Sequence, residues 1–185
     1  MDDQIAISRL KQGNLNGLEI LVNRYQAQAV RAAYLVLYDR ALAEDVVQSA
    51  FVKVAERIHQ FDEERPFAPW FFRVVANDAL KAAQKQRHTL PLDELDKPTV
   101  RLIDRLTDSA PLPEWQLEEK EIRENLLKAI HSLPPEQRAV IVMQYYLDLS
   151  EADMSAKMDR PLSTIKWWLR EARQRLRELL AYDRR

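Results

Sequence analysis

The sequence predicts an all-α protein with two small helical domains joined by an extended linker, and three observations support this. The chain has 185 residues and only 2 glycines, whereas the turns of all-β proteins depend on glycine. Apolar residues recur at helical spacing in several long segments. Residues 89–113 contain four prolines and no sustained periodicity. We therefore expect domains at 1–88 and 114–185, separated by an acidic linker at 89–113.

The first domain is expected to contain four helices. Residues 2–12 predict a short helix that ends at the glycine in KQGN. The apolar pattern predicts a helix from Gly17 to Tyr38 and a second long helix with apolar positions from Leu42 to Ile58. The segment HQFDEERPF breaks this pattern. A further helix follows over 68–88, with Pro69 in its first turn.

The second domain is expected to end in a helix-turn-helix. Helices are predicted over 114–133 and, after two prolines, over 135–148. A short helix capped by Ser150 then runs to Met158, and the last helix runs from a Ser163 cap to Leu180. The tight turn between these two helices carries Asp159, a residue type that tolerates the left-handed backbone conformation. A basic second helix in this arrangement is typical of DNA-binding proteins.

Charge is unevenly distributed although the net charge is only -1. Residues 70–88 contain four basic and one acidic side chain, a net charge of +3, and residues 160–185 contain eight and three, a net charge of +5. Residues 88–117 contain three basic and six acidic side chains, a net charge of -3. Local basic stripes of this kind bind phosphate even in a chain that is nearly neutral.

Several classes of protein are disfavoured by composition. The chain has no cysteine, which excludes disulfides, thiol chemistry and cysteine zinc sites. Its three histidines lack ligand spacing, and no catalytic or phosphate-loop motif is present. We therefore expect no metal, no cofactor and no enzymatic activity. The acidic start lacks an apolar run, and no segment is long and apolar enough for a membrane span, so a cytoplasmic protein is expected.

The last helix sorts into faces when it is projected at about 100° per residue. Trp168 falls at the edge of the apolar arc and Trp167 nearly opposite to it. A basic stripe on one flank is either a solvated face or a phosphate-binding surface, and the preceding turn favours DNA. The apolar arc contains Ile165, Leu169, Ala172, Leu176, Leu179 and Leu180, and the stripe contains Lys166, Arg170, Arg173 and Arg177.

Aromatic residues crowd the start of the helix at 68–88, and basic residues follow them. Phe61, Phe67, Trp70, Phe71 and Phe72 either fill the core or stack on unpaired bases. We expect most of them to be core, because a helix of this length buries several large side chains.

Three stretches together resemble the bacterial extracytoplasmic-function (ECF) sigma factors, and the resemblance covers almost the whole chain. AEDVVQSAFVKVAERIHQFD resembles the helix that grips the clamp of the polymerase large subunit. FAPWFFRVVANDALKAAQKQR resembles the segment that melts and reads the minus-ten element. The stretch from LPPEQRAV to RQRLRELL resembles the domain that reads the minus-thirty-five element. The resemblance implies a sigma region 2 domain at 1–88 and a region 4 domain at 114–185.

The resemblance also implies roles for individual residues. Asn77 matches an asparagine that helps hold a flipped minus-ten base, and the loop from His59 to Pro66 matches the loop that encloses it. Ser49 departs from the family, which often has glutamate there, and Trp167 stands where a small or polar residue is usual. The implied sets are Asp45, Gln48, Ser49, Phe51 and Lys53 for core polymerase; His59, Gln60, Phe61, Asp62, Arg73, Asn77, Lys81 and Lys85 for the minus-ten element; and Ser163, Thr164, Lys166, Trp167, Arg170 and Arg173 for the minus-thirty-five element. Phe51 fits a core position equally well.

The implied function is a transcription initiation factor without catalytic residues. Its implied partners are core RNA polymerase, through the large-subunit clamp and flap, promoter DNA, and an anti-sigma factor. The acidic linker is either a flexible tether or, as the resemblance implies, a segment that enters the active-site and RNA-exit channels of the polymerase. In the second case its acids would mimic nucleic-acid charge there; they are Asp93, Glu94, Asp96, Asp104 and Asp108. Two alternatives are an ordinary helix-turn-helix regulator with a helical sensing domain and a helical adaptor that binds only protein. A plain regulator has no need of DVVQSAF and FAPWFFRVVAN together.

Overall fold

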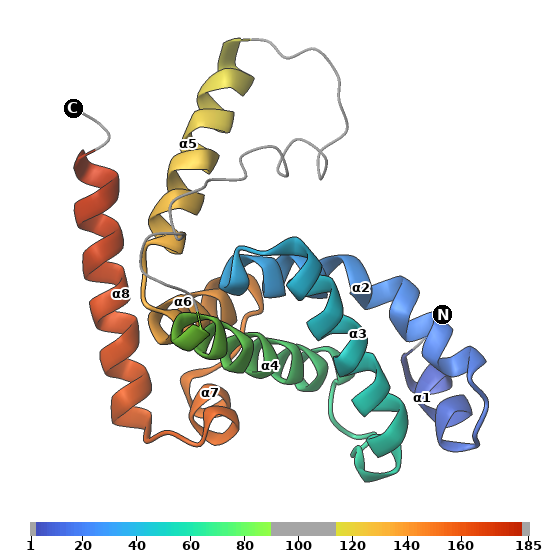
Figure 1. The fold of residues 1–185 in the computed structure, drawn as a ribbon. Helices are drawn as coiled ribbons and strands as arrows, with labels where there is room; N and C mark the ends of the chain where they lie inside the picture. The colour runs from blue at the N-terminus through green and yellow to red at the C-terminus, as the bar shows by residue number, and fades with distance from the viewer. Residues whose placement is uncertain (1–2, 90–113, 183–185) are drawn as a thin grey trace.

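A computed structural model describes residues 3–89 and 114–182, and within these ranges the chain forms helices and no strand. The all-α prediction is confirmed. The linker acids lie outside the described residues. The first half contains α1 (Asp3–Lys11), α2 (Asn16–Leu37), α3 (Arg40–Arg57), the short 3-10 helix η1 (Ile58–Gln60) and α4 (Phe67–Thr89). The second half contains α5 (Glu114–His131), α6 (Pro135–Ile141), the π-helical turn η4 (Val142–Tyr146), α7 (Glu151–Met158) and α8 (Leu162–Tyr182) (Figure 1).

Close backbone approaches and caps set the path of the first three helices. Gly17 lies against α1, where an added Cβ would come within 2.2 Å of the Ala6 carbonyl oxygen. Tyr38 ends α2 in the left-handed conformation, with φ of 58°. Asp39 then caps α3, because its Oδ1 accepts a hydrogen bond from the Leu42 amide at 3.0 Å. The chain can therefore reverse direction over very few residues.

The start of α4 fills the core of the first domain. Phe67 and Phe71 are fully buried, with ring centroids 5.7 Å apart in a stacked arrangement. Phe71 also lies 4.5 Å from the Phe51 ring of α3 and 6.1 Å from the Tyr25 ring of α2. These contacts confirm that most aromatic residues of this segment are core residues, and they fix which face of α4 points away from α2 and α3.

The second domain packs around α6 and the first half of α8. Met154, Ile165 and Leu169 are completely buried there. Arg138 is also buried, and it contacts the Nδ1 atom of His131 at 2.9 Å. Burial lowers the pKa of Arg138 to about 10, and the carboxylate of Glu136 opposes this shift. Arg138 is therefore still a cation at neutral pH.

Two boundary predictions in this domain are wrong. The helix predicted over 135–148 widens after Ile141 into a π turn, in which the Leu147 amide donates to the Val142 carbonyl at 3.1 Å. The last helix begins at Leu162, so Ser163 lies inside it and is not its cap. The Pro161 carbonyl already accepts hydrogen bonds from the amides of residues 164 and 165, so the helix starts two residues earlier than a Ser163 cap would place it.

The two halves pack against each other, whereas the sequence predicted only two domains joined by an extended linker. The Gln84 side chain of α4 donates to Glu136 of α6 at 2.8 Å. The Tyr38 and His131 rings stack with centroids 3.9 Å apart. In Figure 1, α4 crosses the centre of the view, with α6 and α7 beside it and α5 and α8 rising side by side on the left. The local pattern of apolar residues did not predict this contact, since it links residues far apart in the chain.

Candidate nucleic-acid interface

One face of α3 is exposed and carries most of the predicted polymerase-binding residues. Asp45, Gln48 and Ser49 are exposed, and they follow one another at the three- and four-residue spacing of a helix face. Val52 continues this face and is 56% exposed, which is unusual for an aliphatic side chain in the middle of a helix. Sequence analysis did not select Val52, although its position seven residues after Asp45 indicates the same face. Lys53 pairs with Asp78 of α4 at 2.7 Å.

Two aromatic residues assigned to partner contacts lie in the core. The side chain of Phe51 is 6% exposed and that of Phe61 is 4% exposed. Phe51 packs on Phe71, and Phe61 packs on Phe67 and Trp70. Both residues therefore occupy core positions, which agrees with the core alternative for Phe51, and their contacts with polymerase and with the minus-ten element stay predictions. A motif match alone does not distinguish a buried position from an exposed one.

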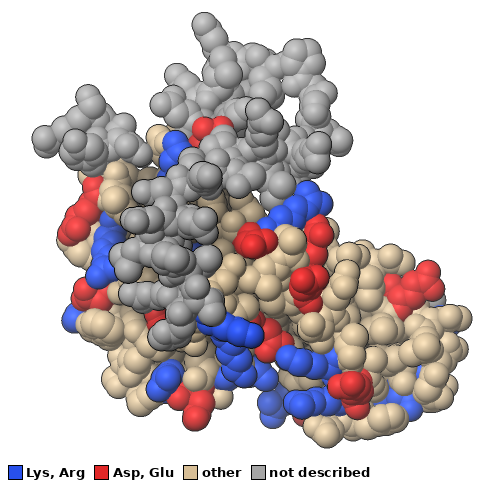
Figure 2. Space-filling view, in the orientation of Figure 1, with Lys and Arg blue, Asp and Glu red and all other residues tan. Residues whose placement is uncertain are grey.

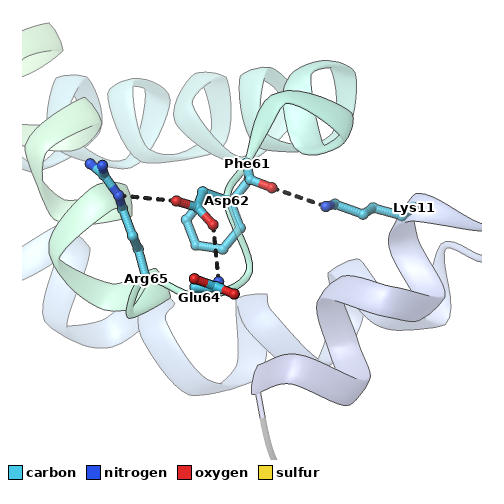
Figure 3. A network of polar contacts seen from close by, with 5 residues as sticks. All are labelled: Lys11, Phe61, Asp62, Glu64 and Arg65. Carbon is cyan, nitrogen blue, oxygen red and sulfur yellow. Dashed lines mark hydrogen bonds and ion pairs between the residues drawn. The ribbon is translucent and has the colours of Figure 1, made fainter.

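The loop between η1 and α4 is ordered by its own polar contacts. Asp62 Oδ1 accepts from the Glu64 amide at 3.1 Å, and Asp62 Oδ2 pairs with Arg65 Nε at 3.1 Å. The Lys11 ammonium group reaches from the end of α1 and donates to the Phe61 carbonyl (Figure 3). The predicted minus-ten residues of this loop, His59, Gln60 and Asp62, are exposed. The loop thus presents polar side chains from a fixed backbone.

A second row of predicted residues runs along α4. Arg73, Asn77, Lys81 and Lys85 are four residues apart and therefore share one face of the helix. Lys81 and Lys85 are exposed, whereas Arg73 and Asn77 are half-buried. Arg73 Nη2 lies 2.5 Å from Asp153 Oδ1 on α7. In this arrangement, a strand of DNA at Arg73 would have to replace that carboxylate with a phosphate.

The structure brings two further cations to this row, Lys157 of α7 and Arg57 at the end of α3. Lys157 of α7 lies close to Asp78 and to three basic groups, those of Arg57, Arg73 and Lys81. Burial lowers the pKa of Lys157, Asp78 raises it, and the three neighbouring cations lower it further. Figure 2 shows Lys and Arg side chains gathered in the lower middle of the molecule, between α7 and the lower end of α3. No sequence pattern could have indicated Lys157, because it comes from the other domain.

The cap of α7 and the turn that follows it have the local geometry that the sequence predicted. The Ser150 hydroxyl accepts from the Asp153 amide at 3.1 Å and donates to the Asp153 carboxylate at 2.7 Å, so Ser150 caps α7. Asp159 ends α7 in the left-handed conformation, with φ of 50°. The Ser155 hydroxyl donates to the Arg160 carbonyl at 2.6 Å, which closes the turn. These contacts place the start of α8 on the outside of the domain.

The two adjacent tryptophans of α8 face different surroundings, as predicted. Trp167 is 48% exposed, while Trp168 is half-buried against the core. Of the other predicted minus-thirty-five residues in the first two turns, Ser163, Lys166 and Arg170 are exposed and Thr164 is half-buried. Leu179, which was placed on the apolar arc, is 41% exposed. The domain core thus covers the first turns of α8 better than the last.

Arg173 is oriented by the π turn. Its Nε donates to the Tyr145 hydroxyl at 2.8 Å, and its Nη2 donates to Gln144 Oε1 at 2.8 Å. The Tyr145 side chain is 65% exposed, and the Arg173 guanidinium lies 5.8 Å from the centroid of its ring. Sequence analysis missed Tyr145, because a helix continuing regularly through 148 would have placed its side chain differently.

The described residues give no indication of a metal site or a membrane span. Among residues 3–89 and 114–182, no group of three or more histidine and acidic side chains is arranged to hold a metal ion. None of the described helices combines the length and the apolar character that a bilayer crossing requires.

The structure combines a basic helix-turn-helix with a helical domain that carries a polar row, which defines a two-domain DNA-binding protein. Comparison with protein families shows which kind of DNA-binding protein it is. The sigma-70 region 2 family matches residues 21–89, and the sigma-70 region 4 family matches residues 123–176. Together these matches cover about two thirds of the chain. The region 2 match speaks against an ordinary helix-turn-helix regulator.

Curated relatives narrow the class further. The ECF RNA polymerase sigma factor SigW of Bacillus subtilis is 26% identical over 176 residues, which cover 94% of each chain. The ECF RNA polymerase sigma-E factor of Haemophilus influenzae is 28% identical over 178 residues, covering 94% of this chain and 93% of that protein. The chain belongs to the ECF sigma factors, and it is an initiation factor that directs RNA polymerase to promoters.

Solved structures share the fold. CnrH, in complex with the cytosolic domain of CnrY, has a TM-score of 0.65 and 22% identity, and the likeness covers 98% of both chains. The sigma factor RpoE of Bartonella quintana, in complex with the anti-sigma factor NepR, has a TM-score of 0.61 and 21% identity, covering 89% of this chain and 97% of that one. At these identities the likeness supports the two-domain helical fold.

Proposed function

We propose that the chain divides promoter recognition between its two halves and that each half uses the surface described above. The polar row on α4 and the loop at 59–66 would bind the minus-ten element, and the outer face of α8 would bind the minus-thirty-five element. The exposed face of α3, centred on Gln48 and Val52, would bind core polymerase. The observation that supports this division best is that these surfaces are formed by separate elements and that most of their residues are exposed, with Arg73 and Asn77 of α4 half-buried.

The chemistry of each surface fits its proposed target. Asn77 and the polar loop offer donors and acceptors of the kind that read an unstacked base on its edge. The first turns of α8 offer Lys166 and Arg170 for guanine edges or phosphates, and Trp167 for a thymine methyl group or a sugar. A helix N-terminus adds backbone N–H groups that favour phosphate.

The proposed setting is a complex with RNA polymerase in the cytoplasm, in which this chain contributes no catalytic group. We propose that the exposed face of α3 contacts the clamp of the polymerase large subunit and that the second domain contacts the flap. The sigma factor RpoE is known in complex with an anti-sigma factor. We include an anti-sigma factor among the proposed partners on that basis.

Promoter binding would require the packed halves to separate. Elements at minus ten and minus thirty-five are about 85 Å apart along B-form DNA, at about 3.4 Å per base pair. A compact chain of this length has a radius of gyration of about 16 Å, which is too small to reach both elements. The chain between Thr89 and Glu114 can span about 80 Å when fully extended, and the breadth of the two halves adds to this, so the separated halves can reach both elements.

Energy transfer between the two halves tests the proposed function. The chain has no cysteine, so Gln28→Cys on α2 and Ala181→Cys on α8 would give two labelling sites at exposed positions. We expect high transfer efficiency in the free protein and at least a twofold loss when core polymerase and promoter DNA are added together. A DNA fragment without a promoter serves as control. Unchanged efficiency in the polymerase–promoter complex would contradict the proposal.

A further inference from the structure

Lys11, at the end of α1, contacts the loop that precedes α4. Lys11 Nζ lies 2.9 Å from the Phe61 carbonyl oxygen and 2.7 Å from Glu63 Oε1. The first contact joins residues 50 apart in the chain. Figure 3 shows the Lys11 side chain extending from α1 to the carbonyl at the point where the loop begins.

The inner side of this loop is already fixed by packing. The Phe61 ring lies 5.0 Å from the Trp70 ring and 5.8 Å from the Phe67 ring, between centroids. The backbone amide of Phe61 donates to the Ile58 carbonyl at 3.0 Å, which closes η1. The side chain and the N–H of Phe61 therefore already have partners in the domain. The carbonyl oxygen of Phe61 belongs to the peptide unit that leads into Asp62, so a contact to this oxygen orients that unit.

The lysine contact sets that orientation. A hydrogen bond from a charged donor is shorter and stronger than one between neutral groups. Because the peptide unit is planar, fixing the Phe61 carbonyl also fixes the N–H and Cα of Asp62. Asp62 in turn holds the Glu64 amide and the Arg65 guanidinium. The lysine thus stands at the start of a chain of contacts that runs through the exposed part of the loop.

The contact differs from an ordinary surface ion pair. The Lys11 side chain is 24% exposed, and one ammonium group serves both a backbone oxygen and a carboxylate. An exposed pair between two mobile side chains contributes little to stability. The Lys11–Glu63 pair also restrains the Phe61 carbonyl. Its main effect is therefore on the conformation of the loop and not on the stability of the fold.

We propose that Lys11 is a positioning residue for minus-ten recognition, holding the loop at 59–66 in the conformation that encloses the flipped base. This inference rests on the proposed function of the loop. Lys11 acts through the Phe61 carbonyl and Glu63 and does not itself contact DNA. The role belongs to α1, which lies outside the residues matched by the region 2 family.

The test measures base preference rather than activity alone. Holoenzyme assembled from core polymerase and each variant is titrated with single-stranded minus-ten oligonucleotides that differ at one position at a time. We expect Lys11→Met to lower the affinity ratio between the preferred and the other bases three- to tenfold. Affinity for a strand without a minus-ten element should stay within twofold of wild type, and Lys11→Arg should retain the preference because its guanidinium still donates.

The control removes another ion pair in which α1 takes part. Arg24 of α2 pairs with Asp3 of α1 at 2.8 Å, so Arg24→Met removes one positive charge and one α1 contact without touching the loop. Its base preference should equal that of wild type. Equal preference in Lys11→Met and wild type would overturn the inference, and so would a uniform loss of affinity for all strands accompanied by a lower melting temperature. A wild-type holoenzyme with no base preference would instead overturn the proposed function of the loop and, with it, this inference.

Discussion

The double substitution Lys166→Ala and Arg170→Ala is expected to lower the affinity of the holoenzyme for its promoter by about 10- to 100-fold at moderate salt. Both side chains are exposed on the first turns of α8, beside Trp167. Loss of one good base contact costs about 1–3 kcal/mol. If both residues also neutralise phosphates, the slope of log affinity against log salt should become shallower by about 2. Titrations of a promoter fragment at several salt concentrations measure both quantities.

A matched pair of charges elsewhere in the domain distinguishes a specific face from net charge. Lys128 and Arg175 line the groove between α5 and α8, away from the first turns of α8. Replacing both with alanine removes the same charge, and we expect a salt slope like that of wild type. Equal slopes in the two double variants would show that the outer face of α8 has no special role in binding DNA.

Replacing Trp168 with alanine is expected to lower the free energy of unfolding by about 2 kcal/mol. Removing a fully buried tryptophan costs about 3–5 kcal/mol, and Trp168 is only half-buried against the core. Trp167→Ala should change the free energy of unfolding by less than about 0.5 kcal/mol, as at other exposed sites. It should instead weaken promoter binding. Chemical denaturation of both variants measures the difference, and equal losses of stability would contradict the assignment of one tryptophan to the core and one to the surface.

The sequence was sufficient for most features that depend on neighbours in the chain, although the cap predicted at Ser163 is wrong. The helical period predicted most helices, and capping chemistry predicted Ser150 and Asp159. Projection of α8 predicted that Trp167 would be exposed and Trp168 would lie at the edge of the core. These features depend on residues within one or two helical turns, where spacing and side-chain chemistry decide the outcome.

Features that depend on distant residues could not be predicted in this way. The Arg73–Asp153 pair joins two domains, and nothing near either residue in the sequence indicates the other. Phe51 and Phe61 matched a motif, but only the packing of α3 and α4 shows that both are buried. The π turn after Ile141 redirects Tyr145 toward Arg173, and a regular helical projection does not produce this contact.

Run-off transcription with purified core polymerase and a library of random upstream sequences tests the central claim most directly. The claim is that this chain directs the polymerase to promoters by recognising two separate elements. We predict that initiation depends on the added protein and that active templates are enriched in two sequence blocks at a fixed spacing. The Lys166→Ala and Arg170→Ala double variant should weaken enrichment of the upstream block alone. Initiation that proceeds equally well without the protein would contradict the claim.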